Sequence, residues 1–163
     1  MLSGSAFFRN QPQALRAAML AGATTNVEGA ALYSSLDGAG QINFLHSYFY
    51  RSGRWWNGPN NAFFDASGVI TDSATLTQGD RVRVAISWLT PGSYVAANNR
   101  PSMEMTLEVR RGSFVRTSTL TGETFQLVDF TAPESGPYTV RIRRTFNSGQ
   151  GNVLLALSVG KVA

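Results

Sequence analysis

The chain has 163 residues, a formal net charge of +4 and 43% hydrophobic residues, which suits one domain with a hydrophobic core. It contains no cysteine and a single histidine, His46, which excludes disulfides, thiolate nucleophiles and metal sites built from several histidines. No apolar run of about 18 residues occurs, so no membrane-spanning helix is expected, and the first residues lack a signal-peptide pattern.

The first expected element is a helix over residues 11–25, QPQALRAAMLAGATT. Pro12 suits the first turn, because its missing N–H would have no partner there. The helix is apolar almost all round, so it should be buried on more than one side. A glycine-rich turn and a second apolar segment follow, LDGAGQINFLHSYFY, which predicts another short helix. His46 lies there and is interpreted as a packed or surface histidine rather than a catalytic one.

The stretch 51–67 is rich in glycine and asparagine yet carries large aromatic side chains, Trp55, Trp56, Phe63 and Phe64. A flexible linker would not need them. Two interpretations stay open: the aromatics pin a connector against the next domain, or they form a platform that binds sugar or peptide. The candidate ligand-binding residues of the second interpretation are Trp55, Trp56, Asn57, Asn60 and Tyr94, with Asn61 and Asp65 as further hydrogen-bonding groups.

From about residue 68 the hydrophobic period changes to two, which predicts half-buried strands. These strands are expected at 69–77, 80–88, 102–110, 113–119, 124–130, 137–144 and 152–159. The last, NVLLALSV, is apolar on both faces and is expected to be central. Turns containing glycine or proline separate the strands. The pattern predicts a mainly β chain, an antiparallel β-sandwich or jelly roll preceded by one or two short α-helices.

Four arginines, Arg81, Arg83, Arg141 and Arg143, fall on the outward phase of their strands. In the simpler interpretation they lie on a solvated sheet face, where Glu104 and Glu108 pair with them across strands. In the other interpretation they form a polyanion-binding face. Nucleic acid is disfavoured as the ligand, because the aromatic residues of these strands lie on the inward phase.

Two groups of motifs, in this order, resemble a known family. The segment NQPQALRAAMLAGATTNVEG followed by LDGAGQINFLHSYF resembles the end of the catalytic domain of a subtilisin-like serine peptidase, or subtilase. GDRVRVAISWLTPGS and FTAPESGPYTVRIRRTFNSGQGNVLLALSVG resemble the β-sandwich appended to many secreted subtilases. The resemblance covers residues 10 to 160. It implies a helical remnant of the catalytic domain at 1–50, an aromatic connector at 51–67 and a β-sandwich domain at 68–163.

No catalytic residue is carried over from this resemblance. The family's Asp, His and Ser motifs have no counterpart, and GSAFF at 4–8 is not a nucleophile motif. We therefore expect no enzymatic activity of the chain alone and no cofactor. The family's sandwich often carries an acidic strand that holds calcium. The matching stretch here is Glu104-Met105-Thr106-Leu107, in which Thr106 replaces the second acid, so one calcium ligand is missing.

The resemblance implies a non-catalytic C-terminal region of a secreted or cell-surface peptidase. It would stabilise the enzyme or assist binding of substrate or surface. Its partners would be the catalytic domain of the parent chain and a polysaccharide or protein substrate. The alternative is a stand-alone carbohydrate- or peptide-binding module, because a fold does not fix a function. The apolar helix at 14–21 is expected to pack on the sandwich, form a homodimer or leave an exposed apolar patch.

Overall fold

The computed structural model describes Phe8, residues 10–23, Tyr33, residues 39–43, Ser47, residues 51–90 and residues 100–161. Most of the second predicted helix falls outside these residues, as do His46 and Tyr94. The elements are α1 (Pro12–Gly22), β1 (Arg51–Pro59), the 3-10 turn η2 (Asn60–Ala62), β2 (Val69–Leu76), β3 (Arg81–Trp88), β4 (Met103–Arg111), β5 (Phe114–Ser118), β6 (Phe125–Thr131), β7 (Gly136–Asn147) and β8 (Asn152–Lys161). The predicted helix and the seven predicted strands are confirmed, with ends shifted by a few residues.

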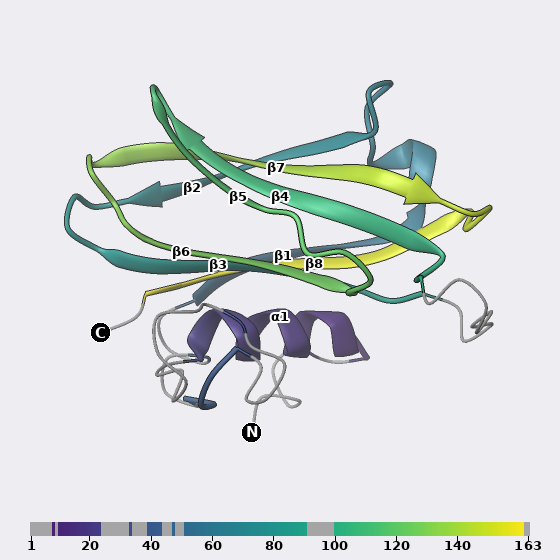
Figure 1. Cartoon of the computed structure of the whole chain (residues 1–163), viewed down its shortest axis with the longest axis horizontal. Coiled ribbons are helices and arrows are strands. Elements are labelled where there is room, and N and C mark those ends of the chain that lie inside the picture. The colour runs from purple at the N-terminus through teal and green to yellow at the C-terminus, as the bar shows by residue number, and fades with distance from the viewer. Residues whose placement is uncertain are drawn as a thin grey trace.

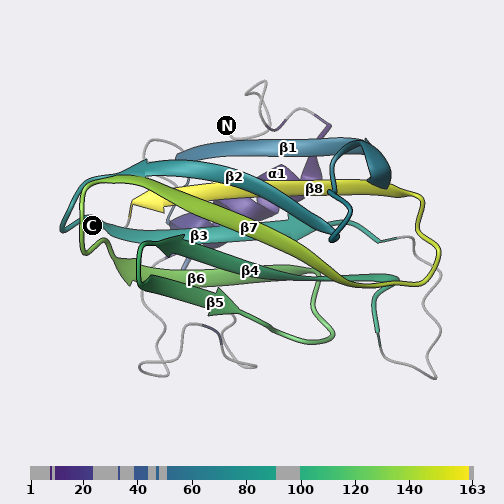
Figure 2. The same ribbon diagram turned by 90° about the horizontal axis from the view of Figure 1, so that it is seen from above.

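Two four-stranded antiparallel sheets pack face to face, as predicted for a sandwich. One sheet has the strand order β1-β8-β3-β6 and is called the helix-covered sheet, because α1 lies along its outer face (Figure 1). The other has the order β2-β7-β4-β5 and is called the open sheet. Viewed from above, no described segment crosses the outer face of the open sheet (Figure 2). The molecule therefore has three layers, and only one outer sheet face carries a described helix.

The core between the sheets follows the period-two pattern of the sequence. Its largest fully buried side chains are Trp88, Tyr138, Ile86, Met103, Met105, Leu107, Ile142 and Leu155. Burying a side chain of this size contributes about 1.5–3 kcal/mol. The indole Nε1 of Trp88 donates a hydrogen bond to the carbonyl oxygen of Met103 at 2.8 Å, so its polar atom is satisfied. Strand β8 lies between β1 and β3, which confirms its predicted central position.

One glutamine, Gln126, is completely buried in this core. Its Nε2 donates to the carbonyl oxygens of Met105 at 2.7 Å and Leu120 at 2.8 Å. Its Oε1 accepts hydrogen bonds from the Ser118 hydroxyl at 2.6 Å and the Leu120 backbone N–H at 2.9 Å. The amide is fully paired, so its burial costs little, and it ties β6 to β4 in the opposite sheet.

Helix α1 lies unusually close to the helix-covered sheet. The facing residues are small on both sides: Ala14, Ala17, Ala18 and Ala21 on the helix, and Ala85, Ser87, Ala156, Ser158 and Gly160 on β3 and β8. A Cβ added at Gly160 would lie 2.5 Å from the carbonyl oxygen of Ala21. The two surfaces can approach this closely because neither carries a large side chain. The helix is thus packed on the sandwich, one of the three outcomes expected for it.

The segment expected as an aromatic connector contains a strand of the sandwich. Strand β1 pairs with β8 along its whole length, from Arg51 opposite Gly160 to Pro59 opposite Asn152. Arg54 of β1 also pairs with Asp72 of β2 at 3.2 Å, which links the edges of the two sheets. Residues 51–59 therefore form a strand of the β-sandwich. The division of the chain into three domains, 1–50, 51–67 and 68–163, stays a prediction.

Candidate functional site

The predicted ligand-binding residues do not form one platform. Trp55 and Asn57 both lie on the outer face of β1 and are exposed; the exposed fraction of Trp55 is 41%. Trp56 points the other way and packs against the core between the sheets. Asn60 is buried in η2, where its Nδ2 donates to the carbonyl oxygen of Gln150. Tyr94 lies outside the described residues. The structure thus brings together only Trp55 and Asn57.

A groove of about 470 Å³ lies near these two residues at one end of the helix-covered sheet. It is lined by Leu89, Thr90, residues 149–151, Asn152 and Leu154. Leu154 is directly opposite Asn57 in the β1–β8 pairing, so both side chains are on the same sheet face. The Gln150 amide donates to the carbonyl oxygens of Leu89 and Asn152 and accepts from Ser102. Gln150 therefore holds the loop in place and shapes the groove.

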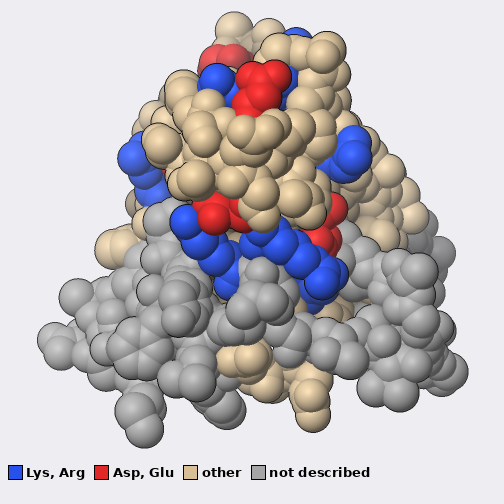
Figure 3. All heavy atoms as spheres, turned by 90° about the vertical axis from the view of Figure 1, so that its left-hand side faces the viewer, with Lys and Arg blue, Asp and Glu red and all other residues tan. Residues whose placement is uncertain are grey.

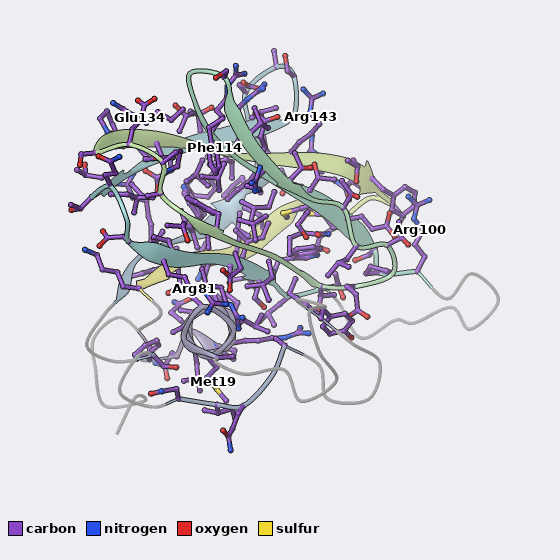
Figure 4. The ribbon with its side chains drawn as sticks, turned by 60° about the vertical axis from the view of Figure 1, so that its left-hand side comes forward. Met19, Arg81, Arg100, Phe114, Glu134 and Arg143 are labelled. Atoms are coloured by element: carbon purple, nitrogen blue, oxygen red, sulfur yellow. The ribbon has the colours of Figure 1, made fainter. Side chains whose placement is uncertain are left out.

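The four outward arginines cannot form one polyanion-binding face. Arg81 and Arg83 are on β3 of the helix-covered sheet, whereas Arg141 and Arg143 are on β7 of the open sheet. Arg81 and Arg143 accordingly lie on opposite sides of the sandwich (Figure 4). The sequence pattern predicts which side chains of a strand point away from the core, but it does not predict to which sheet the strand belongs.

Arg83 is also not solvated, which corrects the expectation that its head stays in water. The residue is only 4% exposed, because the end of α1 covers this part of the sheet. Its Nη1 donates to the carbonyl oxygens of Ala23 at 2.5 Å and Ala39 at 3.1 Å. Its Nε and Nη2 donate to Asp129 at 3.2 Å and 3.1 Å. Since Ala23 follows the last turn of α1, the cation lies at the negative end of the helix dipole.

Opposite charges are mixed at the end of the sandwich that contains the β2–β3 turn. Lys and Arg side chains lie beside Asp and Glu side chains there, without a large single-sign patch on the described surface (Figure 3). Arg81 pairs with Asp129 at 3.4 Å, and Lys161 pairs with Asp80 at 2.7 Å. The hydrogen bond from Lys161 is the main cause that lowers the pKa of the Asp80 carboxyl, and the Thr77 backbone N–H adds to it. This end offers no concentrated charge for a polyanion.

The outer face of the open sheet has a small polar depression of about 100 Å³. It is lined by Val69, Thr106, Leu107, Glu108, Thr117, Thr119, Arg141 and Arg143. Nη1 of Arg141 donates to Glu108 at 3.3 Å, so the predicted pairing of Glu108 with an outward arginine is confirmed. The register places Thr106 beside Arg143 and Glu108 beside both Arg141 and Thr117. We call these residues the open-sheet depression.

The acidic strand considered for calcium makes other contacts. Glu104 pairs with Arg100 at 2.6 Å and accepts a hydrogen bond from the Gly122 backbone N–H at 3.4 Å. Thr106 lies in the open-sheet depression. Across the residues that the structure describes, no group of three or more His, Cys, Asp or Glu residues is placed to hold a metal ion.

A second groove of about 310 Å³ lies along α1. It is lined by Pro12, Leu15, Arg16, Met19, Leu20, Ala23, Ala39, Gly40 and Ile42. Met19 projects from the side of the helix away from the sheets (Figure 4), and Ile42 is 49% exposed. Arg16 reaches back to the sandwich, where it donates to the Thr124 hydroxyl at 2.6 Å. Burial is the main cause that lowers the pKa of Arg16, and Glu123 opposes it.

Comparisons with known proteins find only distant similarities in structure. The sequence matches no protein-family model and no curated protein. The pre-peptidase C-terminal domain of a collagenase from Bacillus anthracis is similar in structure, with 10% identity, a TM-score of 0.44, and coverage of 68% of this chain and 89% of that chain. A periplasmic inhibitor of g-type lysozyme from Aeromonas hydrophila is similar with 11% identity, a TM-score of 0.41, and coverage of 68% and 85%. Both TM-scores are below 0.5, so these distant resemblances identify neither a family nor a function.

No described helix is long and apolar enough to cross a membrane. The predicted absence of catalytic residues stays a prediction, because His46 and several other segments of the chain lie outside the described residues.

Proposed function

We propose that this chain is the non-catalytic C-terminal region of a secreted subtilisin-like serine peptidase. In this proposal α1 belongs to the end of the catalytic domain, and the sandwich stabilises the enzyme or assists binding of substrate or surface. The order of the sequence motifs supports the family, and the sandwich fold is compatible with the domain appended to its secreted members.

The observation that carries the proposal is the two-sided character of α1. One side is made of alanines and packs on the helix-covered sheet. The other side carries larger apolar residues, Leu15, Met19 and Leu20, which are only half-buried and line the groove along the helix. A helix in the last part of a larger catalytic body would use this second side to pack against that body. The helix would then join the sandwich to the enzyme.

The first test measures the mass of the native protein with an antibody against this chain. The proposal expects a polypeptide well above 17.6 kDa, which is the mass of the chain alone. Its protein-hydrolysing activity should be lost when a serine upstream of this chain is replaced. The purified chain itself should hydrolyse no protein substrate. A native protein of 17.6 kDa only, or hydrolysis by the pure chain, would contradict the proposal.

A matched pair of substitutions tests the role of α1 in the larger polypeptide. Met19→Asp places a charge on the outer side of the helix and should lower the heat stability of the peptidase activity. Thr75→Asp places the same charge on the exposed face of β2 and should have no such effect. In the isolated chain Thr75→Asp should leave the melting temperature unchanged, whereas Met19→Asp should lower it by a few degrees, because Met19 is half-buried and packs beside Ala14, Ala17 and Ala18. In the larger polypeptide the loss of stability caused by Met19→Asp should exceed the loss in the isolated chain. Equal losses of activity in the two variants would argue against a contact through α1.

A stand-alone carbohydrate- or peptide-binding module is the second candidate. The observation that favours it is the pair Trp55 and Asn57, an aromatic face and an amide exposed side by side on β1. Quenching of tryptophan fluorescence by a polysaccharide, abolished by Trp55→Ala but retained in Asn61→Ala, would support it. Absence of quenching across neutral and acidic polysaccharides would reject this site.

A further inference from the structure

The open-sheet depression combines one cation without a partner and several hydroxyl groups. Within the described part of the chain, Arg143 makes no ion pair, and its side chain is exposed. Thr106 is directly opposite Arg143 on β4, and Thr117 and Thr119 line the same depression from β5 and the residue just after it. A guanidinium without an ion pair can donate two parallel N–H hydrogen bonds to an anion. The neighbouring threonine hydroxyls can donate further hydrogen bonds to the same ligand or accept them from it.

Basic side chains outnumber acidic ones in the open-sheet depression and beside it. Arg141 points the same way but shares its charge with Glu108 at 3.3 Å, and Arg110 lies 3.9 Å from the same carboxylate. Two arginines therefore share a single carboxylate, whereas Arg143, which is opposite Thr106, makes no ion pair within the described residues. Glu108 remains an acceptor for a ligand hydroxyl, and a sugar offers several hydroxyl groups around its carboxylate.

The position in the sheet limits the kind of ligand. The depression lies over β7, β4 and β5, whose backbones pair with one another along this region. The inner strands β7 and β4 are paired on both sides, whereas β5 is the edge strand of this sheet. Thr106, Glu108 and Arg143 lie on the two inner strands, so a ligand seated over them meets side chains rather than the free backbone groups of a strand edge. Such a ligand is recognised by side chains, through a carboxylate and hydroxyl groups.

We propose that the open-sheet depression binds the uronic-acid unit of an acidic polysaccharide. The carboxylate of the sugar would accept hydrogen bonds from the guanidinium of Arg143, and ring hydroxyls would meet Thr106, Thr117 and Glu108. The volume of about 100 Å³ suits one such group rather than a whole sugar chain, so neighbouring units lie across the flat sheet face. This site is independent of the proposed peptidase origin and of the Trp55 face on the opposite sheet.

The experiment measures binding of a short galacturonic-acid oligomer to the full chain by titration calorimetry. A neutral galactose oligomer of the same length and poly-L-glutamate serve as comparison ligands. The proposal expects binding of the acidic oligomer, with affinity that falls as salt rises, and no binding of the neutral one. Arg143→Ala should weaken binding about ten-fold or more, since it removes a charge-assisted contact. Thr106→Val should weaken it several-fold while keeping the shape of the side chain.

Arg81→Ala is the matched control, because it removes the same charge from an exposed strand position on the opposite side of the sandwich (Figure 4). It should leave the affinity within about two-fold, which is less than 0.5 kcal/mol at 1.4 kcal/mol per ten-fold. Thermal melting of each variant checks that the fold is retained.

Four outcomes overturn the proposal. They are no measurable binding of the acidic oligomer, equal binding of the neutral oligomer, and equal losses in Arg143→Ala and Arg81→Ala. The fourth is binding of poly-L-glutamate as tight as the sugar with the same dependence on Arg143, which would assign the depression to acidic peptides. None of these results bears on the native mass of the protein, so they are distinct from failure of the proposed function.

Discussion

Arg83 and Asp129 face each other on β3 and β6, with Nη2 of the arginine 3.1 Å from the carboxylate, directly beside the end of α1. The same guanidinium donates to the carbonyl oxygens of Ala23 and Ala39. One buried side chain therefore connects the helix end, a segment around residue 39 and two strands. The helix and the sandwich are held together by this contact as well as by apolar packing.

Replacing Arg83 by methionine should destabilise the chain strongly. The change leaves Asp129 without its buried partner and leaves two carbonyl oxygens without a donor, which costs about 3 kcal/mol. Arg81→Met, which breaks an exposed pair with the same aspartate, should cost less than about 1 kcal/mol. Urea unfolding measures both values. Equal free energies of unfolding for the two variants would mean that the buried contact does not hold the helix.

Gly160→Ala should weaken the packing of α1. The new Cβ would lie 2.5 Å from the Ala21 carbonyl oxygen, so helix and strand must move apart, at a cost of about 1–3 kcal/mol. Gly151→Ala is the control, since no atom lies within 4 Å of a Cβ at that position, and it should change stability by less than about 0.5 kcal/mol. Amide hydrogen exchange should show faster exchange in α1 for the first variant only. Unchanged protection of the helix would contradict the close packing.

Two buried serines should respond oppositely to replacement by alanine. The Ser118 hydroxyl donates to Gln126 and accepts from the Leu127 N–H, so its loss leaves buried groups unpaired and costs about 1–3 kcal/mol. The Ser87 hydroxyl is buried against α1 and has no hydrogen-bond partner among the residues that the structure describes, so Ser87→Ala should be neutral or slightly stabilising. Thermal unfolding of the two variants compares them directly. A larger loss in Ser87→Ala would indicate a partner for that hydroxyl.

Asp80 should give stability that depends on pH. Its carboxyl pKa is lowered from 3.8, mainly by the hydrogen bond from Lys161. A lowered folded-state pKa means that the contribution is present above the unfolded pKa and is lost as pH falls through the folded one. The difference in free energy of unfolding between the unchanged chain and Asp80→Asn should therefore disappear as the pH falls below about 4. Carboxyl NMR titration should show a pKa below the ordinary range, which Lys161→Met moves upward. A pKa that is unchanged in that variant would reject the assigned cause.

The strand pattern was predictable because the core positions of β3, β4 and β7 alternate with polar residues, apart from the small Ala85 of β3. Val82, Val84 and Ile86 needed no tertiary information to be placed inside. Strand β1 was missed because RSGRWWNGP carries a tryptophan on each face and also glycine and proline, so it has no period of two.

The burial of Arg83 could not be predicted from β3 alone, because the helix that covers it is distant in sequence. A signal was nevertheless present: three successive outward positions of β8, Ala156, Ser158 and Gly160, are small, which is typical of a closely covered sheet face. The open-sheet depression was missed for another reason. Its residues come from β7, β4 and β5, and only the strand register places Thr106 beside Arg143.

Because α1 packs on β8, the helix can reach its final position only after β8 has been synthesised. The helix is the first described element to leave the ribosome, whereas the strand that it packs on is the last. Its alanine side can be buried only after nearly all of the sandwich has been translated, so the nascent chain carries an uncovered apolar helix throughout. Such a segment is a target for chaperones and a risk of aggregation. Fusion of the sandwich strands to a helix supplied later in the sequence should therefore fold with less aggregation than the natural order.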